Sequence, residues 1–298
     1  MLRNFFRLTI LSKVKTAILI TAYKNVHQIV DIINYFDDRF NFYIHFDKKN
    51  TPHDIYKLHS YKNVHVYNEY KVNWGSLNHL KAILFLCQEA LKDQNNNYFH
   101  LISGQDFPTK PIDFYLNNNQ NFLQFEKLPT ESWNGNGGLN RYSYFNIFDH
   151  ISLKNKTRLL KLNNWFINLQ RTFKIERRSL YSTFKTIYGG GTWWSLSREA
   201  LEFVVNNPNA NIYLKRMRYC FCSEEIYFQS ILMNSDFKQT IQNNNLRYID
   251  WESNRGGIPS FLDSTDFDKI IAHDYLFARK FNDSTSEQLK NLLIAKNK

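Results

Sequence analysis

The chain has 298 residues, of which 43% are hydrophobic and 16% aromatic, and its formal net charge is +11. This length and composition exclude an intrinsically disordered chain and predict a substantial hydrophobic core. No apolar run is long enough to cross a bilayer, and no small-residue cleavage site follows the cationic residues 1–15, so we expect no signal peptide. Three cysteines fit neither a disulfide framework nor a zinc site, which favours a cytoplasmic location.

Strands alternate with helices in the first hundred residues, which predicts an α/β fold with a mostly parallel central sheet and helices on both faces. The expected elements are strand 15–23, helix 26–36, strand 41–46, strand 64–67, helix 77–91 and strand 98–102. Ligands of such sheets bind at the carboxyl ends of the strands. Tyr23, Asp47 and Asp106 lie at or just beyond these ends.

The pattern is less regular after residue 125. Glycines at 135–138 and 189–191 predict loops where the backbone can approach a ligand closely. A short strand is expected at 193–196, a helix from Ser197 to about 205, and a terminal helix over 284–298. Without an internal repeat or a Pro/Gly-rich linker, we expect one domain over 1–298 with its core at about 15–282.

Residues 151–185 carry nine Lys or Arg against Glu176 alone. Apolar residues recur there at steps of three and four, which predicts one apolar stripe on a basic helix: Leu159, Leu162, Phe166, Leu169 and Phe173. Two interpretations stay open. The helix packs on the domain with a solvated cationic back, or it docks on an anionic membrane or a lipid-linked acceptor. No nucleic-acid-binding motif accompanies the charge, so we expect no nucleic-acid partner.

Two separated motifs indicate the chemistry. Cys222-Ser223-Glu224-Glu225 offers a carboxylate at the start of an apolar helix, and residues 276–281 place Arg279 and Lys280 on an apolar segment. A sugar-nucleotide transferase that works without a metal needs such a pair. The carboxylate accepts a proton from the acceptor hydroxyl, and the cations hold the departing diphosphate.

These pieces, in this order, resemble the core-2/I-branching β-1,6-N-acetylglucosaminyltransferase and peptide O-xylosyltransferase family, in its short bacterial form. The matching segments span nearly the whole chain: 17–22, 45–48, 72–76, 101–108, 190–198, 223–231 and 276–281. The resemblance implies a GT-A type fold and an inverting, metal-independent transfer from a UDP-sugar.

The resemblance also implies site residues. Glu225 matches the position of the catalytic base, with Glu224 as the adjacent alternative, and Arg279 and Lys280 take the place of a metal with Arg247 as a third cation. The other expected contacts are with the uridine, at Asp47, and with the donor or acceptor sugar, at Asp106, Glu126, Arg141, Thr192 and Trp193.

The sole Asp-x-Asp string, Asp266-Phe267-Asp268, follows Ser264-Thr265 and is interpreted as acids of a first helical turn, so no metal cofactor is expected. Thr192 stands where the xylosyltransferases carry an acid, which weakens a xylose donor. Arg279 stands where the branching enzymes have Asn, and in this segment the chain is closer to the xylosyltransferases. The donor sugar therefore stays open on these residues.

We interpret the chain as an inverting UDP-sugar transferase, with N-acetylglucosamine as the preferred donor sugar. The expected acceptor is a saccharide or lipid-linked oligosaccharide in capsule or lipopolysaccharide synthesis, with peripheral contact to the inner face of an anionic membrane. The alternatives are a UDP-xylose transferase of the same family and a non-catalytic module that binds polyanions or glycans.

Overall fold

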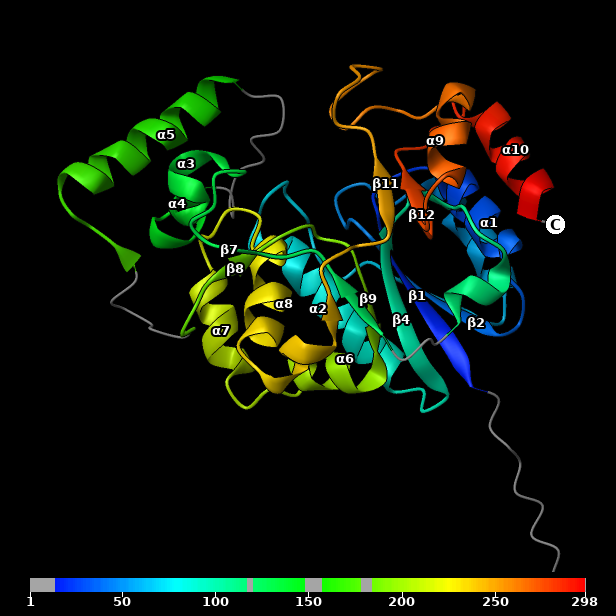
Figure 1. Ribbon diagram of the computed structural model, residues 1–298, viewed down its shortest axis with the longest axis horizontal. Coiled ribbons are helices and arrows are strands. Elements are labelled where there is room, and N and C mark those ends of the chain that lie inside the picture. Colours follow the sequence, from blue (N-terminus) through cyan, green and yellow to red (C-terminus); the bar gives the residue numbers. More distant parts are fainter. Residues whose placement is uncertain (1–13, 117–119, 148–156, 178–183, 298) are drawn as a thin grey trace, which may run out of the picture.

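The computed structural model describes residues 14–116, 120–147, 157–177 and 184–297 (Figure 1). A seven-stranded sheet runs through its centre, in the spatial order β10 (Ile241–Gln242), β6 (Asn121–Leu123), β9 (Trp194–Ser197), β4 (Asn96–Ser103), β1 (Lys15–Ala22), β2 (Phe40–Phe46) and β3 (Val64–Tyr67). β4, β1, β2 and β3 are parallel, as are β10 and β6, whereas β9 is antiparallel to both of its neighbours. The predicted mostly parallel sheet is confirmed.

Alternate residues of the central strands enter two separate cores. Ala17 and Leu19 of β1 pack in one core, and Ile18 and Ile20 pack in the other. The first core is covered by α2 (Leu77–Leu91), α6 (Arg198–Val205), α7 (Ala210–Met217) and α8 (Glu224–Met233). The second is covered by α1 (Val26–Tyr35), α9 (Phe267–Ile271) and α10 (Glu287–Asn297). Because both faces are covered, every residue of β2 is buried.

The predicted boundaries agree closely with the structure in this half of the chain. The strand at 64–67 and the helix at 77–91 are found with the expected ends. The terminal helix differs, since α10 begins at Glu287 and not at residue 284. Just before it, the Ser286 hydroxyl donates to the Leu262 carbonyl at 2.6 Å, which holds this segment against the loop before α9.

Two small sheets stand next to the carboxyl ends of the central strands. One contains β11 (Arg247–Ile249), β12 (Phe277–Arg279) and β5 (Asp106–Pro108), where β12 is antiparallel to β5 and Arg279 lies opposite Asp106. The other pairs β7 (Glu126–Lys127) with β8 (Tyr188–Gly189). Since β5 follows β4 directly, Asp106 and Arg279 lie where ligands of such folds bind.

The predicted basic helix is present as α5 (Thr157–Thr172), but its orientation differs from the first interpretation. Leu162, Leu169 and Phe173 of the apolar stripe are exposed, whereas Asn163 and Gln170 are buried. Residues 151–156 and 178–183 of the predicted segment lie outside the described residues. The shorter elements are α3 (Asn134–Gly137), α4 (Leu139–Ser143) and the 3-10 helices η1 (His53–Ser60), η2 (Ile112–Tyr115), η4 (Asp236–Thr240) and η5 (Ser264–Asp266).

Cys87, Cys220 and Cys222 are all buried and carry free thiols. Within the described ranges, no helix combines the length and the apolar character needed to cross a membrane.

Candidate active site

Glu225 lies in the first turn of α8, and its side chain is 27% exposed. Its Oε2 accepts a hydrogen bond of 2.6 Å from Nη1 of Arg141, whose guanidinium stacks 4.2 Å from the Trp133 ring. Burial raises the pKa of Glu225 to about 7, although the Arg141 charge opposes this rise. A carboxylate with this pKa can accept a proton near neutral pH and release it again.

Glu224 points to a different partner. It is 5% exposed, and its Oε1 lies 2.9 Å from Nδ1 of His79 in the first turn of α2. Burial lowers the pKa of His79, but the Glu224 carboxylate outweighs this effect, so the net change is a rise. His79 was not predicted as a site residue from the sequence. Its position about one turn after Gly75-Ser76, a segment of the family resemblance, could have indicated it.

Backbone contacts fix the start of α8 against two glycine loops. The Cys222 N–H donates to the Gly75 carbonyl at 3.0 Å, and the Gly190 N–H donates to the Glu225 carbonyl at 2.9 Å. A Cβ atom at Gly190 would come within 1.9 Å of the Gln124 carbonyl oxygen. This approach of two main-chain segments needs glycine at position 190, and the close approach of this loop to a ligand stays a prediction.

Glu126 lies on the neighbouring strand pair, opposite Gly189. Its Oε2 accepts hydrogen bonds from the hydroxyls of Ser132 at 2.6 Å and Thr130 at 2.5 Å. These bonds lower the pKa of Glu126, so its carboxylate stays ionised beside the loop that leads to Trp133 and Arg141. Gly189, the strand partner of Glu126, lies against the Trp133 ring on which Arg141 stacks, so Glu126 and Arg141 lie near the same ring.

Arg279 is held by an aromatic ring and an acid. Its guanidinium lies 4.5 Å from the centre of the Trp193 ring, and its Nε lies 3.8 Å from Oδ2 of the fully buried Asp106. The same carboxylate oxygen accepts from the Ser103 amide at 2.8 Å and from the Ser103 hydroxyl. Burial raises the pKa of Asp106, and Arg279 opposes this change.

Arg279 and Glu225 lie within electrostatic reach of each other. Burial lowers the pKa of Arg279, whereas the charges of Asp106, Tyr23 and Glu225 act in the opposite direction. The structure therefore brings the expected base and the expected cation from α8 and β12 into one site, although 54 positions separate them in the sequence (279 minus 225).

Lys280 and Thr192 flank these residues. Lys280 exchanges backbone hydrogen bonds with the loop before α9, donating to Ser260 at 3.3 Å and accepting from Leu262 at 2.8 Å. Thr192 is buried directly before Trp193. The preceding Gly191 carbonyl accepts from the Gln229 side-chain amide of α8 at 2.8 Å, which links the segment that leads into β9 to α8.

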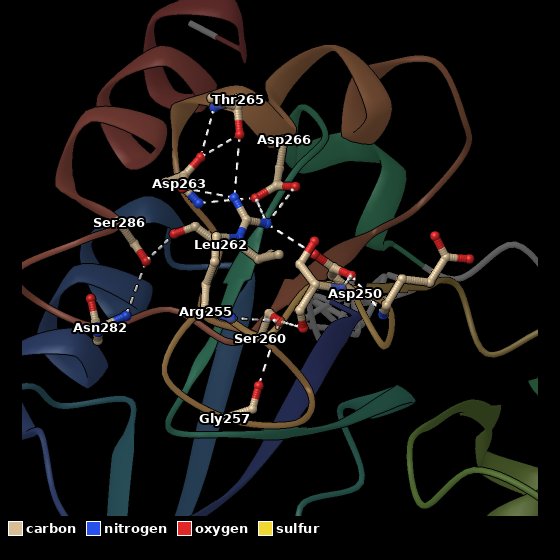
Figure 2. A network of polar contacts seen from close by, with 12 residues as sticks. Asp250, Arg255, Gly257, Ser260, Leu262, Asp263, Thr265, Asp266, Asn282 and Ser286 are labelled. Atoms are coloured by element: carbon tan, nitrogen blue, oxygen red, sulfur yellow. Dashed lines mark hydrogen bonds and ion pairs between the residues drawn. The ribbon is translucent and has the colours of Figure 1, made fainter.

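A cluster of three acids around Arg255 fixes the loop beside Lys280 (Figure 2). The Arg255 guanidinium contacts Asp250 at 2.9 Å and both Asp263 and Asp266 at 2.7 Å. Asp266 also accepts from the Asp263 amide at 3.0 Å in a capping box at the start of η5. Asp268 lies in the first turn of α9, as predicted, whereas Asp266 lies in the single turn of η5 and is the N-cap of α9. In the described part of the chain, no three His, Cys, Asp or Glu side chains are grouped to hold a metal ion.

Arg247 occupies a different environment from Arg279. It is buried, and burial lowers its pKa to about 10. Its Nη1 donates to the Ser195 hydroxyl at 2.9 Å and to the Asn245 carbonyl, and its Nη2 donates to the carbonyls of Leu101 and Trp194 at 3.0 and 2.9 Å. All four Nη hydrogens are thereby used within the protein. The expected direct contact of Arg247 with a diphosphate is not available in this arrangement.

Asp47 follows β2 at the carboxyl edge of the sheet. Its Oδ1 accepts from the backbone amides of Lys49 and Val72, both at 3.0 Å, and its Oδ2 lies 3.6 Å from Nζ of Lys49. Asp47 therefore joins the end of β2 to the loop before Trp74. Trp74 itself is 44% exposed, and its ring meets the Phe221 ring edge-on at 5.0 Å.

Two cavities differ in their relation to this group of residues. One of about 460 Å³ lies between α1 and α10 and contains none of the expected site residues. Another of about 300 Å³ is lined by Arg247 together with amides and aromatic rings, including Gln124, Asn245, Tyr248, Trp251 and Tyr275. Asn245 also contacts Gln124 at 3.1 Å, next to Gly191, so the second cavity adjoins the Trp193 strand.

Comparisons with known proteins identify similar chains. A family model described as "Core-2/I-Branching enzyme" matches residues 17–271. A xylosyltransferase of Ciona intestinalis is 24% identical over 91% of this chain and 32% of its own length, and human xylosyltransferase 2 is 22% identical over 85% and 30%. Beta-glucuronosyltransferase GlcAT14A of Arabidopsis thaliana is 30% identical over 36% and 24%. The chain thus spans about a third of the length of these relatives, or less.

Proposed function

Because the chain belongs to the Core-2/I-Branching enzyme family, we propose that it transfers a sugar from a UDP-sugar to a hydroxyl of a saccharide acceptor. The relatives include proteins named xylosyltransferase and glucuronosyltransferase, which supports sugar transfer without fixing the sugar. The observation that carries the proposal is the partly buried Glu225 carboxylate, with its pKa of about 7, within electrostatic reach of Arg279.

In the proposed reaction, Glu225 acts as the general base. The acceptor oxygen attacks the anomeric carbon as its proton passes to Oε1 or Oε2 of Glu225, and the bond from this carbon to the β-phosphate oxygen breaks. The electron pair of that bond leaves with UDP. A single in-line displacement of this kind inverts the anomeric carbon. Proton transfer to a positioned carboxylate contributes roughly 10²–10⁴-fold to the rate.

Arg141 is proposed as a positioning residue for this base. Its 2.6 Å hydrogen bond to Oε2 fixes the Glu225 carboxylate, and its stacking on Trp133 fixes the guanidinium. Glu126, whose strand partner Gly189 lies against Trp133, is proposed to accept hydrogen bonds from acceptor hydroxyls because its carboxylate stays ionised.

Arg279 and Lys280 are proposed to stabilise the leaving diphosphate without a metal. Trp193 and Asp106 already hold the Arg279 guanidinium, so little reorganisation is needed when negative charge develops. The Asp-x-Asp acids support this view, because Asp266 is bound to Arg255 in a helix cap. Arg247 is proposed to act indirectly, through its charge near Asp106. The uridine is proposed to bind at the loop fixed by Asp47.

N-acetylglucosamine is the donor sugar we propose, and xylose is the alternative that the xylosyltransferase relatives favour. Thr192 supports the former, because it supplies a neutral hydroxyl next to Trp193. We further propose an acceptor used in bacterial surface-glycan synthesis on the cytoplasmic side of the membrane.

Thermal unfolding with ligands tests the proposal. The midpoint is measured with UDP, UDP-N-acetylglucosamine, UDP-xylose, UDP-glucuronic acid and GDP, each with and without EDTA. A ligand at 100 times its Kd adds about 2.7 kcal/mol to the free energy of unfolding, which is a visible shift. Stabilisation by UDP that survives EDTA is expected, and the donor that stabilises most enters a UDP-release assay. Stabilisation by heparin alone, without any response to UDP, would support the polyanion-binding module instead.

A further inference from the structure

The outward face of α5 is apolar and basic. Leu162, Trp165 and Leu169 are 49%, 59% and 38% exposed, and they recur at steps of three and four residues. Arg158 and Lys161 are exposed on the same face, one turn before Leu162 and Trp165. Large apolar side chains gathered in this way on one helix face mark an interaction surface.

Polar contacts fix this orientation of the helix. The buried Asn163 accepts from the Ile147 amide at 3.1 Å and donates to Asn146 at 3.2 Å. Two turns later, Gln170 accepts from the Phe145 amide at 2.9 Å and donates to the Phe145 carbonyl at 3.0 Å. Buried amides with satisfied hydrogen bonds resist rotation, because turning the helix inward would leave them unpaired. The apolar side chains therefore remain outside.

The charge of the face limits what can cover it. The sequence of α5, TRLLKLNNWFINLQRT, contains no acid, and the exposed Lys174 extends the basic character past its end. The chain as a whole carries +11, so two copies of this face would repel each other. Anionic lipid headgroups match both the basic and the apolar side chains. Basic residues together with Trp and Leu on one helix face are typical of helices that lie in a membrane interface.

We propose that the outward face of α5 docks on an anionic bilayer surface. Leu162, Trp165 and Leu169 enter the boundary between headgroups and acyl chains, and Arg158 and Lys161 bind lipid phosphates. Trp165 suits this depth because its indole is apolar with one polar N–H. α5 is bonded to the segment that follows α4, the helix of Arg141, so docking brings the proposed site close to the membrane. This inference goes beyond the proposed transfer reaction and does not depend on it.

Vesicle sedimentation tests the proposal with the full chain. Vesicles of phosphatidylcholine with 30% phosphatidylglycerol are compared with phosphatidylcholine alone, at 50 and 300 mM NaCl. We expect binding to the anionic vesicles that weakens with salt. The charge variant Arg158→Glu/Lys161→Glu should bind at least about tenfold more weakly, because each basic residue near such a surface contributes about a fivefold factor. Leu162→Ser/Trp165→Ser should also lose binding by about tenfold or more.

Matched controls separate this face from the rest of the surface. Lys62→Glu and Tyr56→Ser change exposed residues of the same kinds elsewhere and should bind like the unaltered chain. Thermal unfolding and UDP binding are measured for every variant, so loss of folding or of the proposed function is seen separately. Failure of the unaltered chain to bind anionic vesicles, or equal binding by the α5 variants, overturns the proposal. A dimer in analytical ultracentrifugation that Trp165→Ser dissociates would assign the face to self-association and overturn it as well.

Discussion

His79 Nδ1 lies 2.9 Å from Oε1 of Glu224, so the residue next to the proposed base already has a partner of its own. Glu224 is 5% exposed and is held by this contact, whereas Glu225 is 27% exposed, is bonded to Arg141 and lies within electrostatic reach of Arg279. Two adjacent acids thus have different environments. This difference favours Glu225 as the proposed base, with Glu224 influencing its charge.

We expect Glu225→Gln to lower kcat by roughly 10²–10⁴-fold, because the amide cannot accept the proton of the acceptor hydroxyl. Stabilisation by UDP should persist, since the change leaves Arg279 and Lys280 intact. The measurements are UDP release and thermal unfolding with UDP, with Glu69→Gln, an exposed acid, as the control. Full activity in Glu225→Gln would remove the base assignment.

Glu224→Gln should shift the pH profile of kcat/KM without abolishing turnover. Glu225 must be ionised to act, so activity should rise with pH and level off above about 7. The Glu224 charge raises the pKa of Glu225, and His79 lowers it to a smaller extent. Removing the Glu224 charge should therefore lower the pKa of Glu225 and move the acid limb to lower pH. A shift to higher pH, or loss of activity at every pH, would contradict this assignment.

Arg279→Gln should weaken UDP binding and turnover together, by roughly 10²–10³-fold in kcat/KM, because a fixed cation is lost where charge develops. Arg279→Lys should recover only part of this loss, since a lysine lacks the planar group that stacks on Trp193. Calorimetry with UDP and a UDP-release assay provide the two readouts. Arg158→Gln, which removes an exposed arginine far along the chain, should match the unaltered protein in both.

Arg255→Ala should destabilise the protein by about 1–3 kcal/mol, because the buried Asp266 loses the cation that neutralises it. Urea unfolding measures this change. The same variant should lower turnover, because the loop that it loosens holds the Lys280 backbone at Ser260 and Leu262. Arg255→Ala/Asp266→Asn should regain part of the lost stability, since the uncompensated charge is then removed. Equal stability of both variants would show that the ion pair is not what holds the loop.

Much of the fold could be predicted because its signals are local. The period of apolar residues in α2 and the alternating valines of β3 indicate those elements without reference to the rest of the chain. The glycines at 189–191 predicted a loop, but not that Gly190 packs against the Gln124 main chain. Such features depend on neighbours in sequence or on backbone conformation.

The remainder depends on partners far apart in the sequence. The apolar stripe of α5 left two interpretations open, packing on the domain or docking on a membrane, because the hydrogen bonds of Asn163 and Gln170 to residues 145–147 that set the rotation of the helix leave no sequence pattern. His79 meets Glu224 only because α2 and α8 cover the same face of the sheet. Arg247 was expected to bind a diphosphate with Arg279, yet its Nη2 donates to backbone carbonyls of β4 and β9. These partners lie far from Arg247 in the sequence.

The tight packing of Gly190 against the Gln124 main chain limits how this protein can be redesigned. A methyl group there would collide with the Gln124 carbonyl, and the Gly190 amide is bonded to the carbonyl of Glu225. Moving β8 away from residues 124–125, to make room between these two segments, would therefore also displace the start of α8. Preferences for the proposed acceptor are therefore better changed by exchanging side chains around a fixed main chain, as at Glu126 or Thr130, than by lengthening or shortening the glycine loop.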